Sequence, residues 1–325
     1  MISRVAENLF WLGRFLERAE STARVCLVTR NLALDGDLEP HQAWRPAVIV
    51  SGQEEPFREA HGDEGFADGE RVQEWLTWEE TNISSLRRSV GAARENARSI
   101  REVVSLETWE ATNELHLWMD GAGREVWRSD RHGFYRHVRQ HAQLCLGVIH
   151  GTMLHDDAFS FILLGVMLER AGQTARILDV HHHAFQALGS HEVIETALWL
   201  ALLRACSGFE PFMKVHRGRV SPAAVARFLV VDPLFPRSVR FSLRAAVSRF
   251  ERIRPPDQVD LPGARSASRL TALAGWVGAL EKDFDVAGLH ELLTHVVDET
   301  AAIAGVIGSE LLGYAPGPAA EMSAQ

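Results

Sequence analysis

The sequence predicts an all-α protein, a single helical bundle built from two internally duplicated halves. Hydrophobic residues recur with the period of an α-helix along most of the 325 residues, and no convincing strand-like alternation interrupts them. The 46% hydrophobic content is ordinary for a folded domain. One helical motif also occurs twice, about 150 residues apart. These observations favour one helical domain over residues 1–312, followed by a flexible tail over 313–325.

The repeated motif is FWLGRFLERAESTARV at 10–25 and ILLGVMLERAGQTARI at 162–177. At an offset of 152, the two copies share a glycine, the triplet Glu-Arg-Ala and the triplet Thr-Ala-Arg. Residues 72–90 and 225–243 also align, at the nearly equal offset of 153. Two matches with almost one offset predict a duplication, with halves of about 1–125 and 150–312 related by a pseudo-two-fold axis. A helix near 130–151 would link them.

The expected elements follow the hydrophobic period and the capping signals. Ser3 and the pair Ser221-Pro222 suit helix starts, because serine caps a first turn and proline fits the first helical position. Residues 35–70 are rich in glycine, proline and acid, which predicts an irregular excursion with one short helix near 43–51. The expected helices are 3–34, 71–79, 83–104, 106–120, 130–151, 156–187, 191–206, 221–231, 236–253, 265–284 and 286–312.

Charge and cysteine content narrow the class of protein. The net charge of −9 provides no basic field, so we expect no nucleic-acid partner. Cys26, Cys145 and Cys206 are few and scattered, which predicts a reduced, cytoplasmic setting without a disulfide framework. The first 20 residues form an amphipathic helix with four charges inside its apolar run, which is unlike a membrane span or a signal peptide.

Known catalytic and metal motifs are missing from the sequence. It contains no phosphate-binding P-loop, dinucleotide fingerprint or serine-hydrolase elbow. The histidines of HELLTH, at 290 and 295, are five residues apart and therefore cannot share a helix face as a zinc-protease motif requires. His137 and His141 do share a face and could join Glu17 and Glu169 in a bundle metal site, but no Glu-x-x-His pair accompanies either repeat. We therefore expect no metal and no cofactor, and we expect the run 181–183 to be solvated.

The Glu-Arg helices are the main candidates for a functional site. On each helix the charged stripe lies beside an apolar stripe of leucine and alanine, so Glu17 and Glu169 are expected to be partly buried and to need partners. Two interpretations stay open. The helices could cross and exchange each glutamate with an arginine of the other copy, as a structural network. Alternatively, twinned carboxylates and guanidiniums could form a functional site, and one network could serve both purposes.

Two further segments concentrate polar chemistry. The stretch 94–119 combines Asn96, Asn113 and Glu110 with arginines and a tryptophan, which suits recognition of carboxylate or phosphate. Arg94, Arg98 and Arg101 are spaced to share one helical face. A hydrogen-bonded helix pair around a core tryptophan is the structural alternative. In DPLFPRSVRFSL, at 232–243, a helix start beside Arg237 and Arg240 could hold an anion, or the serine could simply cap the helix.

Taken together, ENLFWLGRFLERAESTAR, ENARSIREVVSLETWEATNELHLW, FILLGVMLERAGQTARILDV and FPRSVRFSL resemble the alpha-E family, a bacterial family of helical proteins with a Glu-Arg motif. The resemblance covers about 1–312. The chain departs from the repeat at Val166 and Gly172, which replace Arg14 and Glu20, and it carries Phe212 in the loop 208–220 where relatives often show a Tyr-Arg pair. The motif residues implied here are Glu17, Arg18, Arg24, Asn96, Arg98, Arg101, Trp109, Glu110, Asn113, Glu169, Arg170, Arg176, Pro236, Arg237 and Ser238.

The resemblance also implies a setting. Family members accompany, or are fused to, circularly permuted ATP-grasp-type proteins, with transglutaminase-like or proteasome-like peptidases nearby. This predicts an accessory subunit of an amide-ligase system, which binds the ligase or a peptide or amino-acid substrate. Its arginines would hold carboxylates. The alternative is an enzyme of amide chemistry in which Glu17 or Glu169, with a pKa raised by burial, acts as acid and base.

Overall fold

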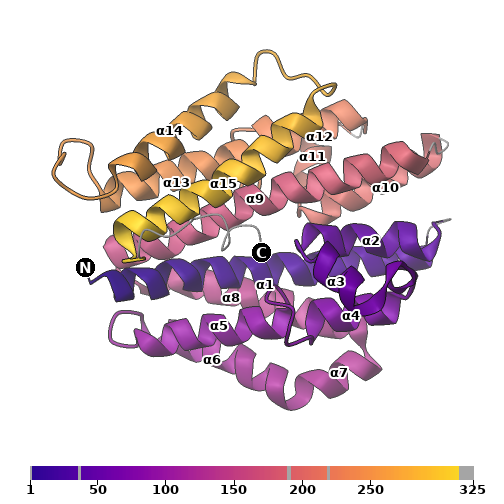
Figure 1. Ribbon diagram of the computed structural model, residues 1–325, viewed down its shortest axis with the longest axis horizontal. Coiled ribbons are helices and arrows are strands. Elements are labelled where there is room, and N and C mark those ends of the chain that lie inside the picture. The colour runs from indigo at the N-terminus through magenta and orange to yellow at the C-terminus, as the bar shows by residue number, and fades with distance from the viewer. Residues whose placement is uncertain (1, 36–37, 189–191, 218–219, 315–325) are drawn as a thin grey trace.

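The protein is all-α, as the sequence predicts. The computed structural model describes residues 2–35, 38–188, 192–217 and 220–314, with the helical backbone alone at 35, 185–188 and 192–195. Every regular element in these ranges is a helix (Figure 1). The longer ones are α1 (Ser3–Asp35), α5 (Leu86–Ser99), α6 (Leu106–Trp118), α8 (Arg131–Thr152), α9 (Asp157–Leu188), α10 (Glu192–Ala205), α13 (Val239–Ile253), α14 (Ala264–Ala279) and α15 (Leu289–Leu311).

Two long helices, α1 and α9, run through the middle of the molecule and pack against each other. α1 also packs on α5 and α8, while α9 packs on α13 and α15. Figure 1 shows these two groups on opposite sides of the central pair. The helices after α1 come in the order α5, α6, α8, and those after α9 in the order α13, α14, α15. The duplication predicted from the sequence requires the two groups of helices to follow in corresponding order. The duplication itself stays a prediction.

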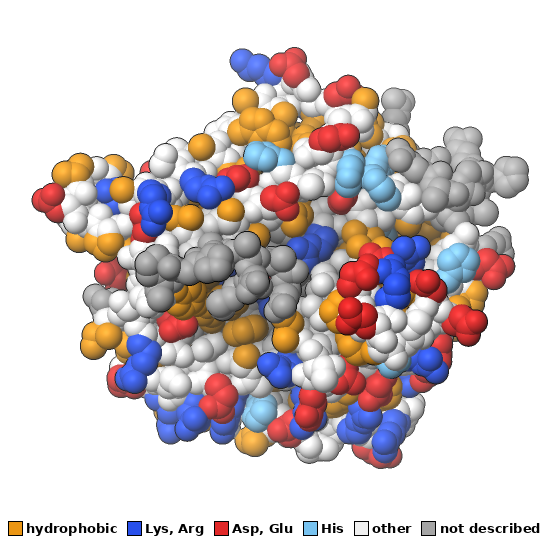
Figure 2. All heavy atoms as spheres, in the orientation of Figure 1, with side chains coloured by type: hydrophobic (Ala, Val, Ile, Leu, Met, Phe, Trp, Pro, Cys, Tyr) orange, Lys and Arg blue, Asp and Glu red, His pale blue; other side chains and the backbone are white. Residues whose placement is uncertain are grey.

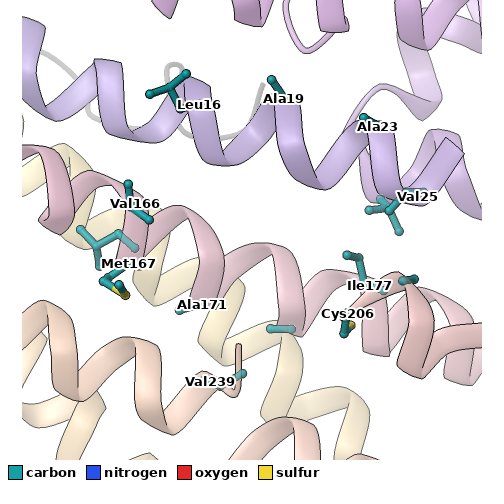
Figure 3. Close-up of a cluster of buried hydrophobic side chains, with 14 of the residues drawn as sticks. Leu16, Ala19, Ala23, Val25, Val166, Met167, Ala171, Ile177, Cys206 and Val239 are labelled. Carbon is teal, nitrogen blue, oxygen red and sulfur yellow. The ribbon is translucent and has the colours of Figure 1, made fainter. Parts of the chain in front are cut away.

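The central pair comes close because each helix carries a glycine where it meets the other. A methyl group at Gly13 would overlap the backbone carbonyl of Ile162, and one at Gly165 would overlap that of Phe10. Only glycine leaves room for this approach of two backbones. Ala19, Ala23 and Ala171 are buried as well, and Figure 3 shows them among larger apolar side chains of α1 and α9.

The segment 35–70 is more helical than expected. It forms α2 (Pro40–Val50), α3 (Glu54–His61) and the 3₁₀ turn η1 (Asp63–Ala67), where the sequence predicts a single short helix. Pro40 occupies the first turn of α2, where a missing N–H costs nothing. Trp44, Phe57 and Phe66 are buried, so these short elements are held by packing against the bundle. Local composition alone could not indicate that packing.

Several other boundaries differ from the expectation. Helix α5 ends at Ser99 and not near 104, so Arg101 lies in the turn that follows. The segment expected as a loop at 208–220 contains α11 (Phe209–His216), and Phe212 is fully buried there. The remaining elements are α4 (Gly69–Thr77), the π-turn η2 (Met119–Gly123), α7 (Arg124–Ser129) and α12 (Pro222–Val231).

The expectation of a solvated histidine run at 181–183 is wrong for two of its members. His181 and His182 are buried, while His183 is exposed. His181 is paired through Nδ1 with the carbonyl of Ile177, at 2.8 Å, and the His182 ring lies 6.0 Å from that of Trp199. The cause is that α9 continues to residue 188 and α10 covers one of its faces.

The tail predicted over 313–325 lies outside the described residues from 315 onward. Within the described part of the chain, none of the helices combines the length and apolar character needed to cross a bilayer.

Candidate functional site

The first half of the site is built around Glu17 of α1. Its carboxylate accepts two hydrogen bonds from Arg170 of α9, at 3.0 and 2.7 Å. Arg237, which immediately precedes the N-cap of α13, donates a third at 2.7 Å. The glutamate side chain is completely buried, whereas the two arginines remain 13–14% exposed. Glu17 is therefore a buried anion held by two cations of the other half, in a bidentate geometry that favours strong pairing.

The second half mirrors the first around Glu169 of α9. Arg18 of α1 donates to both carboxylate oxygens, at 2.7 and 3.2 Å, and Arg14 donates at 2.7 Å. Gln173 adds a weaker bond at 3.3 Å. The structure thus contains the exchange of Glu17 and Glu169 with arginines of the opposite copy that one interpretation of the sequence required.

The two halves differ in the source of the second arginine. Arg14 supplies it on α1, but α9 has Val166 at the matching position. Arg237 compensates from α13, and the carbonyl of the same residue accepts a hydrogen bond from Thr174 at 2.9 Å. Each glutamate consequently keeps two arginines, although the sequence repeat provides only one in common.

A third carboxylate extends the network beyond the repeat. Glu20 is fully buried and accepts from Arg237 at 2.8 Å and from Gln143 of α8 at 2.8 Å. It also forms an ion pair with Arg24 one turn later. Nε and Nη1 of Arg24 have no hydrogen-bond partner in the structure, and burial together with the nearby Arg237 lowers the pKa of Arg24.

The pKa of both repeat glutamates is lowered, so the raised values considered for the enzyme alternative are wrong. Burial alone would raise the pKa of Glu17, but Arg170 and Arg237, with Arg24, outweigh it and lower the pKa to about 2. Burial is likewise outweighed at Glu169, where Arg18 and Arg14 hold the pKa well below 4.5. Both side chains are ionised and weakly basic at neutral pH, which is unsuited to general-base catalysis.

The candidate residues of 94–119 lie elsewhere, on α5 and α6. The Trp109 ring is flanked by two guanidiniums, with Arg101 at 4.8 Å and Arg94 at 5.6 Å from its centroid. Arg94 also donates to Asn113 at 3.2 Å. We call Arg94, Arg101, Trp109 and Asn113 the tryptophan cluster. The expected common face of three arginines does not form, because α5 ends before Arg101 and Arg98 turns to Glu95.

Two candidates from this stretch are not part of the cluster. Glu110 is exposed on α6. Asn96 lines a pocket of about 700 Å³ on the other side of α5, together with Trp11, Phe15 and Tyr314. Arg14 and Arg18 stack on Trp11 and Phe15, with guanidinium-to-centroid distances of 5.1 and 5.5 Å. The pocket therefore shares a wall with the arginines that hold Glu169.

At the start of α13, the capping alternative is confirmed. The Ser238 hydroxyl accepts from the backbone N–H of Phe241 at 3.0 Å and donates to the carbonyl of Asp232 at 2.6 Å. Pro236 accepts a long hydrogen bond from Arg170 at 3.5 Å. Arg237 forms ion pairs with Glu17 and Glu20, so its charge is part of the buried network.

Arg176, the counterpart of Arg24, lies against the turn after α2. A methyl group at Gly52 would come within 2.9 Å of Nη1 of Arg176, and Gly52 has a φ of +74°. Burial lowers the pKa of Arg176. Two features therefore favour glycine at position 52: its left-handed backbone conformation and the arginine side chain packed on it.

The metal site considered from His137, His141, Glu17 and Glu169 does not form among the described residues. The ring centroids of His137 and His141 are 3.9 Å apart, and His137 stacks on Trp118 at 3.7 Å. Both glutamates bind arginines instead.

Sequence reasoning missed three partners in this network: Arg14, Glu20 and Gln143. Arg14 and Glu20 each have a detectable signal, because they continue the polar stripe of α1 one turn before Arg18 and one turn before Arg24. Gln143 has no such signal, since α8 meets Glu20 only through the tertiary fold.

Comparison with known proteins gives the chain a family. The chain is 26% identical over 282 residues to uncharacterised proteins of Mycobacterium tuberculosis and Mycobacterium bovis. The alignment covers 82% of this chain and 30% of each relative, so the chain spans less than a third of their length. No solved structure matches it significantly. The Alpha-E model, described as a predicted alpha-helical domain with a conserved ER motif, matches residues 1–311. This protein therefore belongs to the Alpha-E family.

Proposed function

We propose that this protein is an accessory subunit of an ATP-grasp-type amide-ligase system, which binds the ligase or presents a peptide or amino-acid substrate to it. The observation that carries the proposal is the saturation of Glu17 and Glu169 by arginines. Groups that are buried, ionised and fully paired stabilise a scaffold and do not exchange protons with a substrate. The enzyme alternative, which needs one of them as acid or base, is not favoured.

A second feature supports a binding role. The tryptophan cluster lies at the surface of α5 and α6, with Arg101 exposed and Trp109 partly buried. Arginine and tryptophan are enriched at the energetically dominant positions of protein interfaces. Arg98 and Glu110 add exposed charges of both signs beside it. We place the ligase contact on this surface.

The pocket beside α1 supports the version of the proposal in which the protein presents a substrate to the ligase. Arg4 and Glu7 bring opposite charges to its wall, and Trp11 and Phe15 provide an aromatic surface. A guanidinium binds a carboxylate, and a carboxylate binds an ammonium, so the two ends of an amino acid or a peptide find complementary groups there.

The length of the relatives supports a partnership with another protein. The matched region is 30% of each mycobacterial relative, which leaves room for further domains in the same chain.

The test is co-expression of the tagged protein with a circularly permuted ATP-grasp-type protein of the same organism, followed by affinity purification. We expect retention of the ligase by the wild type and loss by the double variant Arg101→Ala/Trp109→Ala. Arg128→Ala is the matched control, because Arg128 is an exposed arginine of α7 outside the cluster. Equal retention by all three would refute the assigned surface. No retention by the wild type at micromolar concentration would contradict a stable complex.

A further inference from the structure

A cluster of potential metal ligands lies far from the Glu-Arg network, between the C-terminal part of α9 and the start of α15. Asp179 and His183 are one turn apart on α9, and His290 is the second residue of α15. One candidate ligand atom from each lies within 4.8 Å of the other two. Among the described residues, this is the group of at least three histidine, cysteine, aspartate or glutamate side chains whose ligand atoms are close enough to bind one metal ion.

Asp179 and His290 are already aligned across the two helices. Nδ1 of His290 and Oδ1 of Asp179 are 2.9 Å apart and share a hydrogen bond. The ring of His183 lies 4.4 Å, centroid to centroid, from that of His290. Ligand atoms around a tetrahedral zinc ion are about 3.3 Å apart, given bonds of about 2.0 Å. The three candidate ligand atoms, within 4.8 Å of one another, are close to that spacing.

The electrostatic setting favours a cation. Asp179 carries a negative charge within the cluster, and Glu291 adds another beside His290. The side chain of His290 is 50% exposed and that of Asp179 is 20% exposed, so an ion from solvent can reach them. Figure 2 shows imidazole side chains exposed on the part of the molecule that α9 and α15 form.

We infer that Asp179, His183 and His290 form a binding site for a divalent transition-metal ion, with zinc as its reference ligand. The donor set of two imidazoles and one carboxylate suits Zn²⁺, Co²⁺ or Ni²⁺, whereas Mg²⁺ and Ca²⁺ prefer oxygen ligands alone. The ion takes the position of the proton between His290 and Asp179, and the imidazole then carries its proton on Nε2. Three protein ligands leave a coordination position for water or for a ligand from a partner.

The proposed site links two helices that are far apart in the sequence. It cross-links the C-terminal part of α9 to the beginning of α15, in addition to the Asp179–His290 hydrogen bond and the contact between the rings of His183 and His290. The sequence could not reveal it, because His290 is 111 residues away from Asp179 and no compact ligand motif results. The site runs against the expectation, drawn from the motifs, that the chain binds no metal.

The experiment is calorimetric titration of Zn²⁺ into the full chain, after chelator treatment and removal of any histidine tag. We expect one tight site per chain, no binding of Mg²⁺, and an affinity reduced at least 100-fold in His290→Ala and in the isosteric Asp179→Asn. The control is His141→Ala, because His141 and His137 form a histidine pair at helical spacing outside the site, and loss of His141 should leave zinc binding unchanged.

The result that would overturn the inference is zinc affinity that is equal in wild type, His290→Ala and Asp179→Asn, since the 15 histidines of the chain could bind zinc diffusely. Circular dichroism checks that each variant is folded. The exposed substitution His183→Gln provides a further test that does not disturb the helix contact.

Discussion

Glu17 of α1 accepts two hydrogen bonds from Arg170 of α9, across 153 residues of sequence. The same relationship recurs in reverse between Glu169 and Arg18. Two reciprocal pairs fix both the angle and the register at which the central helices cross. The glutamates are inside the protein and the arginines at its edge, so the network belongs to the scaffold.

Removing the charge of Glu17 should destabilise the protein strongly. In Glu17→Gln, Arg170 loses its anion while remaining largely enclosed, and Arg237 keeps only Glu20. Breaking a buried pair from one side costs about 3–5 kcal/mol. Urea unfolding followed by circular dichroism measures the change, with the exposed Glu59→Gln of α3 as a control expected to change by less than about 0.5 kcal/mol. Equal stability of the two variants would show that the network contributes nothing.

The glycines at the helix crossing should tolerate no side chain. Gly13→Ala and Gly165→Ala each place a methyl group on a backbone carbonyl of the other helix, so α1 and α9 must separate. We expect a loss of about 1–3 kcal/mol or more in each. Gly91→Ala on α5 faces open space and should be neutral or slightly stabilising, because alanine has the higher helix propensity. Thermal unfolding of the three variants decides, and similar melting temperatures would contradict the close crossing.

Acid should weaken the network in a defined window. The pKa of Glu17 is about 2 in the folded protein, against an ordinary 4.5, so its ionisation stabilises the fold above pH 4.5 and this stabilisation is lost as pH falls toward 2. The difference corresponds to about 3 kcal/mol. The gap in unfolding free energy between wild type and Glu17→Gln should therefore shrink from pH 5 to pH 3. A gap that does not change with pH would contradict the assignment.

Arg24 should be the most replaceable charge of the network. Among the described residues its Nε and Nη1 have no hydrogen-bond partner, and Glu20 keeps Arg237 and Gln143 when Arg24 is lost. Loss of Arg24 therefore removes an ion with unsatisfied polar atoms and does not leave Glu20 without a cation. We expect Arg24→Met to lie within about 1 kcal/mol of wild type in urea unfolding. A loss as large as that of Glu17→Gln would mean that Arg24 has a binding partner of its own.

The sequence predicts the all-α fold, and the exchange of glutamates and arginines is one of the two interpretations that it leaves open for the Glu-Arg helices. Both depend on local periodicity and on a repeated motif. The helical periodicity of α1 and α9 is strong enough to set their lengths within a residue or two. It fails where tertiary packing decides. Trp44 and Phe57 convert an apparently irregular segment into α2 and α3, and Arg237 reaches Glu17 from 220 residues away.

The tryptophan cluster shows a different limit. Arg94, Arg98 and Arg101 have helical spacing in the sequence, yet the helix ends at Ser99. Arg98 pairs with Glu95, whereas Arg94 and Arg101 flank the Trp109 ring. The residue pattern does not predict a helix end that is caused by tertiary packing when no glycine or proline marks it.

The most direct test of the structural role is a double-mutant cycle on Glu17 and Arg170. The unfolding free energies of wild type, Glu17→Gln, Arg170→Met and the double variant give the energy of their interaction. A favourable coupling of about 1–3 kcal/mol is expected, with the double variant less destabilised than the sum of the single variants. Strict additivity would show that the two residues do not stabilise each other, and the assignment of the Glu-Arg motif to the scaffold would then be wrong.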